Sequence, residues 1–301
     1  MTRPASILLM VVAAFTSTAS GFQRNVPVTP KTSPFVEERA ATDLQTLVGF
    51  GPRPAGSEAI VKARTYIVAE LRKAGLNPQL DEFDARTPRG VRHMINIRAF
   101  RPGSKGTRTI ALTGHYDTKF FENIRFVGAS DGGSSAAWLL EFARCTRDLK
   151  LENTLEFVFF DGEEAVVEWT DDDSVYGSRH DVDRRLRENK LKDLKAMILV
   201  DMIGDKNLNI RKESQSTGWL KDIIWNTAQS IGYSKQFPTD QMDVSDDHVP
   251  FLKVGVPAVD LIDFDYPAWH TTDDTIDKVS AHSLKIVGDV VYFSLPAIDR
   301  H

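Results

Sequence analysis

Acidic residues and histidines directly follow several apolar runs of this sequence. They are His115 after residues 109–113, Glu163 and Glu164 after residues 154–160, Asp201 after residues 196–200, and His270 after residues 256–262. A further acid, Asp131, lies in a glycine-containing segment just before a helix-like stretch. Histidine nitrogens and carboxylate oxygens are ligands that zinc accepts. These residue types therefore predict metal-assisted chemistry, in which one carboxylate of the Glu163–Glu164 pair binds the metal and the other acts as a general acid or base.

The elements that must position these residues can be read from the apolar pattern. Strands are expected at residues 94–100, 109–113, 154–160, 196–200 and 256–262, and helices from Val36 to about residue 48 and at 58–73, 134–144, 182–194, 218–231 and 280–297. Nearly continuous apolar strands that alternate with helices predict a single-domain α/β/α sandwich around a central mixed, mostly parallel sheet. Ligands of such sheets bind beyond the carboxyl ends of the strands, so the acids and histidines should gather at one edge.

Each of these residues also has a purely structural explanation when it is taken alone. His115 could pack at the end of a strand, and Asp131 could cap the following helix. Asp201 could stabilise a loop, and His270 could be a half-buried histidine beside Trp269. Their joint occurrence at one expected edge of the sheet is the argument for a functional site.

Composition narrows the kinds of site that the chain can build. The chain has 301 residues, a formal net charge of −5, one cysteine and seven histidines. One cysteine excludes both an internal disulfide and a zinc site of several cysteines, so metal ligands must come mainly from His, Asp and Glu. A mildly acidic chain without long Lys/Arg runs argues against nucleic-acid binding.

The N-terminus has the layout of a secretory signal peptide. Arg3 precedes an apolar run at residues 7–15, and small residues follow up to Gly21. That run is much shorter than the about 20 residues that span a bilayer, so no stable membrane insertion is expected, although an uncleaved tether is the alternative. We therefore predict a signal peptide at 1–21, a flexible lead-in at 22–35 and a catalytic domain at 36–301. The mature protein would be secreted or periplasmic, and a monomer.

Longer strings carry a family resemblance. They include residues 115–119 (His-Tyr-Asp-Thr-Lys), 126–131 (Phe-Val-Gly-Ala-Ser-Asp), 159–165 (Phe-Phe-Asp-Gly-Glu-Glu-Ala), 176–180 (Tyr-Gly-Ser-Arg-His), 246–251 (Asp-Asp-His-Val-Pro-Phe) and 269–271 (Trp-His-Thr). The sequence resembles the zinc-dependent aminopeptidase clan and, within it, the glutaminyl-peptide cyclotransferases. The strings at 176–180 and 246–251 are not general motifs of the clan.

The resemblance implies a role for each matching residue. One zinc ion would be held by Asp131, Glu164 and His270, and Glu163 would be the general acid and base. Trp169 would wall the substrate pocket, and Trp269 with Tyr266 would line its mouth. Asp201 and Asp246 would form a hydrogen-bonded catalytic carboxylate pair that shares a proton. The implied substrates are peptides and proteins with N-terminal glutamine, which would be converted to pyroglutamate with release of ammonia.

Two other functions remain open from the residues. A two-zinc aminopeptidase would use His115, Asp131, Glu164, Asp201 and His270 as ligands, with Glu163 activating water. In the one-zinc interpretation His115 instead supports the metal site by hydrogen bonding, without binding the metal. A binding module or pseudoenzyme on the same scaffold would need a missing ligand or a missing acid, and the sequence lacks neither. Trp169 and the strings at 176–180 and 246–248 favour the cyclotransferase.

Overall fold

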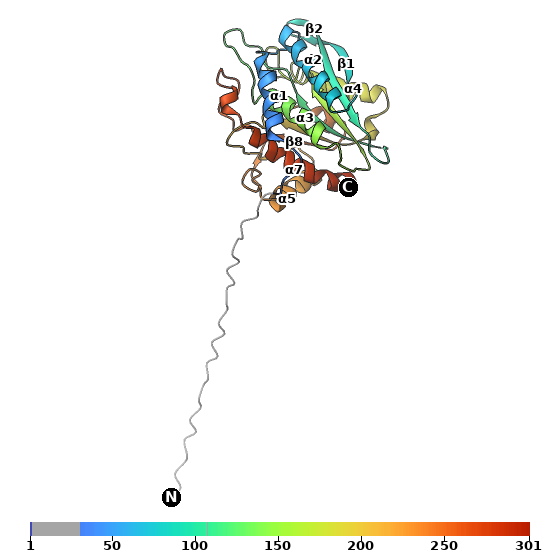
Figure 1. Cartoon of the computed structure of the whole chain (residues 1–301), viewed down its shortest axis with the longest axis vertical. Coiled ribbons are helices and arrows are strands. Elements are labelled where there is room, and N and C mark those ends of the chain that lie inside the picture. The colour runs from blue at the N-terminus through green and yellow to red at the C-terminus, as the bar shows by residue number, and fades with distance from the viewer. Residues whose placement is uncertain (2–30, 107) are drawn as a thin grey trace.

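A six-stranded sheet lies at the centre of the chain (Figure 1). The computed structural model describes residue 1, residues 31–106 and residues 108–301, so most of the predicted signal peptide lies outside the described residues. The strands of the sheet, in spatial order, are β1 (Gln79–Thr87), β2 (Gly90–Arg101), β4 (Thr154–Phe160), β3 (Thr109–His115), β5 (Leu194–Asp201) and β8 (Ala258–Ile262). The last four are parallel, whereas β1 and β2 are antiparallel to their neighbours. The predicted mixed, mostly parallel sheet is therefore confirmed.

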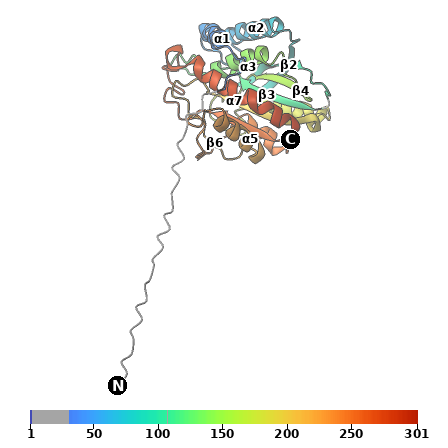
Figure 2. The ribbon, with the colours of Figure 1, turned by 60° about the horizontal axis from the view of Figure 1, so that its bottom comes forward.

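Helices cover both faces of this sheet (Figure 2). Those on one face are α1 (Glu37–Gly49), α2 (Glu58–Lys73), α3 (Gly133–Cys145), α5 (Gly218–Ser230) and α7 (Ala281–Arg300), and those on the other are α4 (Tyr176–Arg187) and α6 (His248–Lys253). Two short 3-10 turns, Leu191–Asp193 and Ile276–Lys278, and a small two-stranded sheet of β6 (Lys212–Glu213) and β7 (Gln241–Met242) complete the described elements. Among the described residues, no helix is both long and apolar enough to cross a membrane.

Two apolar clusters lie on opposite faces of the parallel strands. On β5, Ile198 and Val200 belong to the larger cluster under α1, α3 and α7, while Met197 and Leu199 belong to the smaller cluster under α4 and α6. Side chains alternate between the faces of a strand, so a strand covered on both faces must be apolar at every position. This explains why the parallel strands are visible as continuous apolar runs in the sequence.

Three elements depart from the sequence expectation. The strand β1 was not expected, because most of its residues are exposed and it carries no apolar run. The short helix α6 was not expected either, since it has one internal proline and only six residues. The helix α4 begins at Tyr176 and not at Val182. Its first turn depends on tertiary packing: a Cβ on Gly177 would come within 2.6 Å of the Asn96 side chain and the Asp161 carbonyl.

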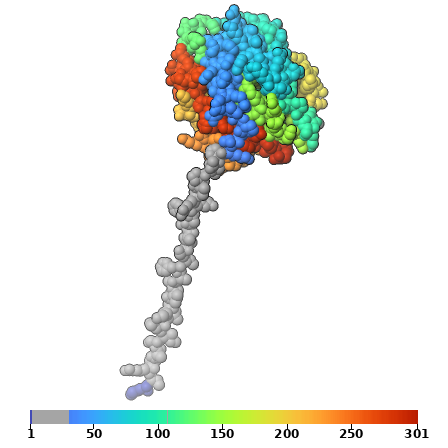
Figure 3. Space-filling model, in the orientation of Figure 1, coloured from blue at the N-terminus to red at the C-terminus, as the bar shows by residue number. Residues whose placement is uncertain are grey.

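Residues 31–35 lie against the C-terminal helix (Figure 3). The backbone N–H and the hydroxyl of Ser33 both donate to the carboxylate of Asp289 on α7, at 2.7 and 2.6 Å. The next turn is held by Glu141 of α3, which accepts from the backbone N–H of Val36 at 3.0 Å. Residues 22–30 of the expected lead-in lie outside the described residues.

Candidate active site

The acids and histidines singled out in the sequence meet beyond the carboxyl ends of the parallel strands. His115 is the last residue of β3, and Asp201 is the last residue of β5. Glu163 and Glu164 follow β4, and Asp131 precedes α3. His270 lies in the long connection between β8 and α7.

Asp131, Glu164 and His270 form a group that fits a metal ion. The His270 Nε2 atom lies 3.4 Å from Asp131 Oδ2 and 3.5 Å from Glu164 Oε2. Two ligand atoms about 2.0–2.2 Å from a tetrahedral zinc are about 3.3–3.6 Å apart, so the spacing matches shared coordination. Asp131 Oδ2 is buried and has no hydrogen-bond partner, which leaves it free for a cation. The donor set of one nitrogen and two carboxylates is therefore suited to zinc.

His115, Asp131 and Asp201 form a second group that shares Asp131 with the first. The His115 Nε2 atom lies 3.0 Å from Asp201 Oδ1 and 3.2 Å from Asp131 Oδ1. Asp201 Oδ1 also accepts from the backbone N–H of Met202 at 2.8 Å and from the Ser135 hydroxyl at 3.3 Å. His115 Nε2 and Asp201 Oδ1 are thus already hydrogen-bonded, whereas His115 Nδ1 is buried without a hydrogen-bond partner.

The backbone around Asp131 is held from below by Asp274. The carboxylate of Asp274 accepts from the backbone N–H groups of Ser130 and Asp131, at 2.8 and 3.1 Å, and from the hydroxyl of Tyr266 at 2.8 Å. Gly132 follows with φ of +78°, and a Cβ there would lie 2.2 Å from the Asp117 carbonyl. The segment can therefore turn into α3 only with glycine at this position.

Tyr266 does not lie where it was expected. It was expected at the mouth of the pocket, but it is buried and its hydroxyl is bound to Asp274. Phe264 lines the cavity in its place, two positions earlier in the same connection. The hydrogen bond to the buried Asp274 explains the correction, because it holds the Tyr266 ring beneath the Asp131 loop and leaves Phe264 to line the cavity.

The turn that carries Glu163 and Glu164 is fixed by Asp117. The Asp117 carboxylate accepts from the backbone N–H of Glu163 at 3.1 Å and of Glu164 at 3.4 Å. Glu164 Oε1 accepts from the backbone N–H of Lys119 at 2.9 Å, which leaves Oε2 toward His270. Burial raises the pKa of Glu163 well above its usual range, with further increases from Glu164 and nearby aspartates, although His115 opposes the shift. Glu163 is therefore suited to hold a proton.

A cavity of about 470 Å³ contains most of the expected site residues. Those that line it include Asp131, Glu163, Glu164, Trp169, Asp201, Asp246, Trp269 and His270. Three aromatic side chains, Trp169, Phe264 and Trp269, are each more than one-third exposed at its opening. Trp269 stacks on the ring of His270 with a centroid separation of 4.2 Å, and Phe264 lies 4.8 Å from Trp269. The opening is thus apolar, while the floor is acidic.

His270 has a strained backbone, with φ of +56°. The rings of Phe121 and Phe126 meet its imidazole edge-on, at 5.5 and 5.7 Å between centroids. Left-handed backbone is costly for a residue with a Cβ and persists where the surroundings hold it. The aromatic contacts therefore define the direction in which Nε2 points.

Asp201 and Asp246 line the same cavity. Burial and the charge of Asp201 raise the pKa of Asp246 to about 7, so the two carboxyls interact electrostatically. Asp201 Oδ1 is engaged by His115 and Asp246 Oδ1 accepts the backbone N–H of Asp247, so a shared proton between the two carboxyls would use their other oxygens and stays a prediction. Asp246 Oδ2 is buried and has no partner.

The wall that carries Asp246 is held by residues that the sequence reasoning did not identify. Glu213 of β6 lies 3.1 Å from His248 Nε2. Asp260 of β8 lies 3.7 Å from His248 Nδ1. The neighbouring Ser214 donates to Asp243 at 2.8 Å. Only the string at 246–251 hinted at this arrangement, since Glu213 and Asp260 show no local pattern.

Comparisons with known proteins agree with this geometry. The model of peptidase family M28 matches residues 96–294. The glutaminyl-peptide cyclotransferase of Drosophila melanogaster is 30% identical over an alignment of 267 positions, which covers 78% of this chain and 75% of that protein.

Solved structures of bacterial enzymes give the same picture. The glutaminyl cyclase of an Acidobacteriales bacterium is 36% identical, with a TM-score of 0.84 over 92% of this chain and 99% of its own. The glutaminyl cyclase of Porphyromonas gingivalis is 30% identical, with a TM-score of 0.79 over 87% and 98%. The chain therefore belongs to peptidase family M28 and, within it, to the glutaminyl-peptide cyclotransferases.

Proposed function

We propose that this cyclotransferase converts the N-terminal glutamine of peptides and proteins to pyroglutamate with release of ammonia, in the cavity between Trp169 and Trp269. The observation that carries the proposal is that the two adjacent glutamates have different surroundings, one those of a metal ligand and the other those of a proton acceptor. Glu164 directs Oε2 toward His270 as a metal ligand, whereas Glu163 lines the same cavity with a raised pKa. A proton acceptor thus lies beside a three-ligand metal group.

The residues of the chain would act as follows. Asp131, Glu164 and His270 would hold zinc, which when bound supplies a Lewis acid for the γ-carboxamide oxygen of the substrate. Glu163 takes a proton from the α-amine of the glutamine as that nitrogen bonds to the carbonyl carbon of the side-chain amide, Cδ. It then returns a proton to the departing amide nitrogen, so the C–N bond of the side-chain amide breaks and ammonia leaves. The chain needs no nucleophile of its own, because amine and amide belong to one residue.

Positioning of the glutamine in the cavity would supply much of the acceleration of the ring closure. The ring closure is intramolecular, so holding the glutamine folded brings the reacting atoms together at low entropic cost. Trp169, Phe264 and Trp269 provide apolar surface for the aliphatic stem of the side chain and exclude water from the opening. Exclusion of water favours attack by the amine over hydrolysis.

We propose a single zinc ion per chain and not the two ions of the aminopeptidase alternative. The support is the difference between the two groups. Both groups have the spacing of metal ligands, but Asp131 Oδ2 of the first has no hydrogen-bond partner, whereas His115 Nε2 of the second is already hydrogen-bonded to Asp201 at 3.0 Å. In this proposal His115 orients Asp201 and Asp131 without touching the metal.

The function is tested with a glutamine-initiated peptide and an aminoacyl anilide, assayed side by side on protein of measured zinc content. We expect ammonia and pyroglutamate from the peptide, little release from the anilide, and about one zinc per chain. Cleavage of the anilide without cyclisation of the peptide, together with two zinc ions, would establish the aminopeptidase alternative. Protein that binds no metal and turns over neither compound would indicate a binding module.

We also propose that the enzyme is exported and monomeric. The proposal of export rests on the charge and apolar pattern of residues 1–21. N-terminal sequencing of the enzyme recovered from the cell exterior or periplasm tests the export, with Met1 retained as the contrary result. Light scattering of the purified protein tests the oligomeric state.

A further inference from the structure

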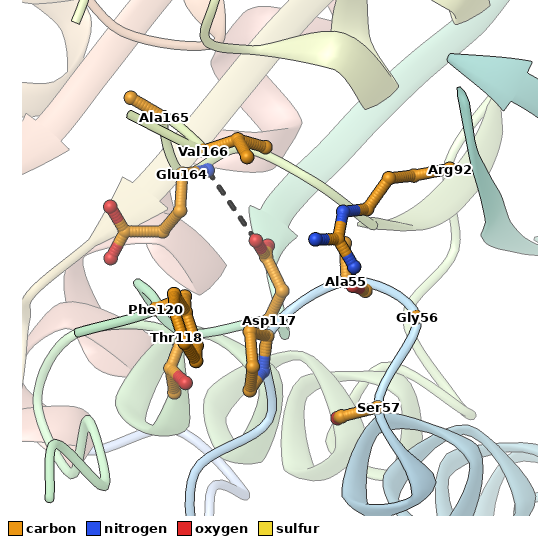
Figure 4. A pocket seen from close by; sticks show the side chains of 11 residues that line it. Ala55, Gly56, Ser57, Arg92, Asp117, Thr118, Phe120, Glu164, Ala165 and Val166 are labelled. Atoms are coloured by element: carbon orange, nitrogen blue, oxygen red, sulfur yellow. Dashed lines mark hydrogen bonds between the residues drawn. The ribbon is translucent and has the colours of Figure 1, made fainter. Parts of the chain in front are cut away.

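A smaller cavity lies on the far side of Glu164 from the metal group (Figure 4). Its volume is about 210 Å³, less than half that of the main cavity. The turn at residues 54–57, the side chain of Arg92 on β2 and the ring of Phe120 line it, together with Ala165 and Val166. We refer to it as the side cavity.

Arg92 is the one cation in the lining of the side cavity. Its only polar contact among the described residues is a 3.5 Å approach of Nη1 to the carbonyl of Ala55, too long for a strong hydrogen bond. Nearby Arg89 differs, because it is paired with Glu122 at 2.8 Å. A half-buried guanidinium without an acidic partner is available to an incoming carboxylate.

The two acids of the lining are turned to other partners. The carboxylate of Asp117 is engaged by the backbone N–H groups of Glu163 and Glu164 (Figure 4). The carboxylate of Glu164 points away from Arg92 in the same view. Its Oε1 accepts from the backbone N–H of Lys119, and its Oε2 lies 3.5 Å from His270 Nε2. The charge that faces the open space is therefore that of Arg92.

The side cavity adjoins the main one across Glu164. Glu164 lines both cavities, and Ala165 and Val166 of the side cavity lead directly to Val167, which lines the main cavity. A peptide whose first residue occupies the main cavity can therefore cross the segment at 164–167 and place a later side chain beside Arg92. The small volume suits one side chain and not a length of main chain.

We propose that the side cavity is a subsite for an acidic side chain of the peptide substrate, downstream of its N-terminal glutamine, which pairs with Arg92. This inference rests on the proposed function. The exposed Phe120 ring provides apolar contact for the methylene groups of the bound side chain. The enzyme would thus favour glutamine-initiated substrates that carry Glu or Asp within the next few residues.

The test uses amidated tetrapeptides that begin with glutamine, with a single Glu at the second, third or fourth position and alanine elsewhere. Each is compared with its isosteric counterpart, in which Gln replaces that Glu. A partly exposed ion pair contributes about 0.2–1 kcal/mol, so we expect KM to be about 1.5- to 5-fold lower for the Glu peptide at the position that reaches Arg92. Amidation removes the other carboxylate.

Arg92→Gln should bring the ratio of the two KM values close to one, and Arg92→Lys should retain part of it. The matched control is Arg86→Gln, which removes the same charge from the other face of the β1–β2 ribbon, since Arg86 pairs with Val91 and Ala85 pairs with Arg92. This control should keep the ratio. A thermal melt of each variant verifies folding.

Each outcome decides the matter. Equal KM values for Glu and Gln peptides in the unmodified enzyme would overturn the subsite, as would a preference that survives Arg92→Gln. Equal loss in both variants would show that the general charge of the surface, and not the side cavity, is responsible. Failure to cyclise the neutral peptides would instead refute the proposed function, so the two failures are distinguishable.

Discussion

Replacement of Glu213 by Gln removes the charged centre that holds one wall of the active-site cavity. The Glu213 carboxylate is fully buried and receives hydrogen bonds from the backbone N–H of Gln215 at 2.8 Å and of Ser216 at 2.6 Å. It also accepts from the Ser216 hydroxyl at 2.7 Å and lies 3.1 Å from His248 Nε2. His248 begins α6, two residues after Asp246. Glutamine keeps the shape but lacks the charge and one acceptor.

The size of the effect follows from the pKa of Glu213. Burial alone would raise it, but the hydrogen bonds from His248, Gln215 and Ser216 outweigh burial and lower the pKa from 4.5 to about 2. At about 1.4 kcal/mol per pH unit, this shift corresponds to about 3 kcal/mol of folding free energy at neutral pH. Because the folded-state pKa is depressed, the contribution is present above pH 4.5 and is lost as the pH falls toward 2.

The assay is urea-induced unfolding of the unmodified enzyme and of Glu213→Gln, followed by circular dichroism at pH 7 and at pH 3. We expect the variant to be less stable by about 3 kcal/mol at pH 7 and by about 1 kcal/mol at pH 3. Glu82→Gln, an exposed acid on β1, is the matched control and should change little. A difference below about 1 kcal/mol at pH 7, or one that does not shrink at pH 3, would refute the reasoning.

Three further substitutions test the site itself. Glu163→Gln should lower kcat by at least about 100-fold while zinc, measured by mass spectrometry, stays bound, and near-normal turnover would remove Glu163 from its role. Glu164→Gln should instead lower the zinc content, and full retention of zinc would reassign the ligand. Asp274→Ala deprives the backbone N–H groups of Ser130 and Asp131 of their buried acceptor, so the protein should lose about 2–4 kcal/mol in urea unfolding, and an unchanged midpoint would contradict this account.

The fold was largely predictable because strands that are buried on both faces of the sheet appear in the sequence as continuous apolar runs. The apolar run at 154–160 has the bounds of β4, and the helix expected at 58–73 has the bounds of α2. Ser57 caps that helix by accepting the backbone N–H of Ile60, as its residue type suggests. The exposed strand β1 offered no such signal.

The positions of some site residues could be predicted from the sequence, whereas those of others could not. Asp131, Glu164 and His270 could be expected together because each follows or precedes a predicted element on one sheet edge. It could not be expected that Phe264 and not Tyr266 lines the cavity, since both are aromatic residues of one irregular connection. Which ring enters the cavity depends on the buried Asp274 that binds the Tyr266 hydroxyl.

The sequence by itself determined the class of fold, the absence of cysteine ligands and the set of acids and histidines from which a metal site must be built. Only the tertiary structure decided which atoms of that set lie within ligand distance, that the Asp201 carboxylate is hydrogen-bonded to His115, and that Arg92 faces open space beside Glu164. The physical reason is the distance along the chain over which each kind of interaction acts. Periodicity and turn chemistry act over a few neighbouring residues, whereas the spacing of ligands and the pairing of charges depend on segments brought together from distant parts of the chain.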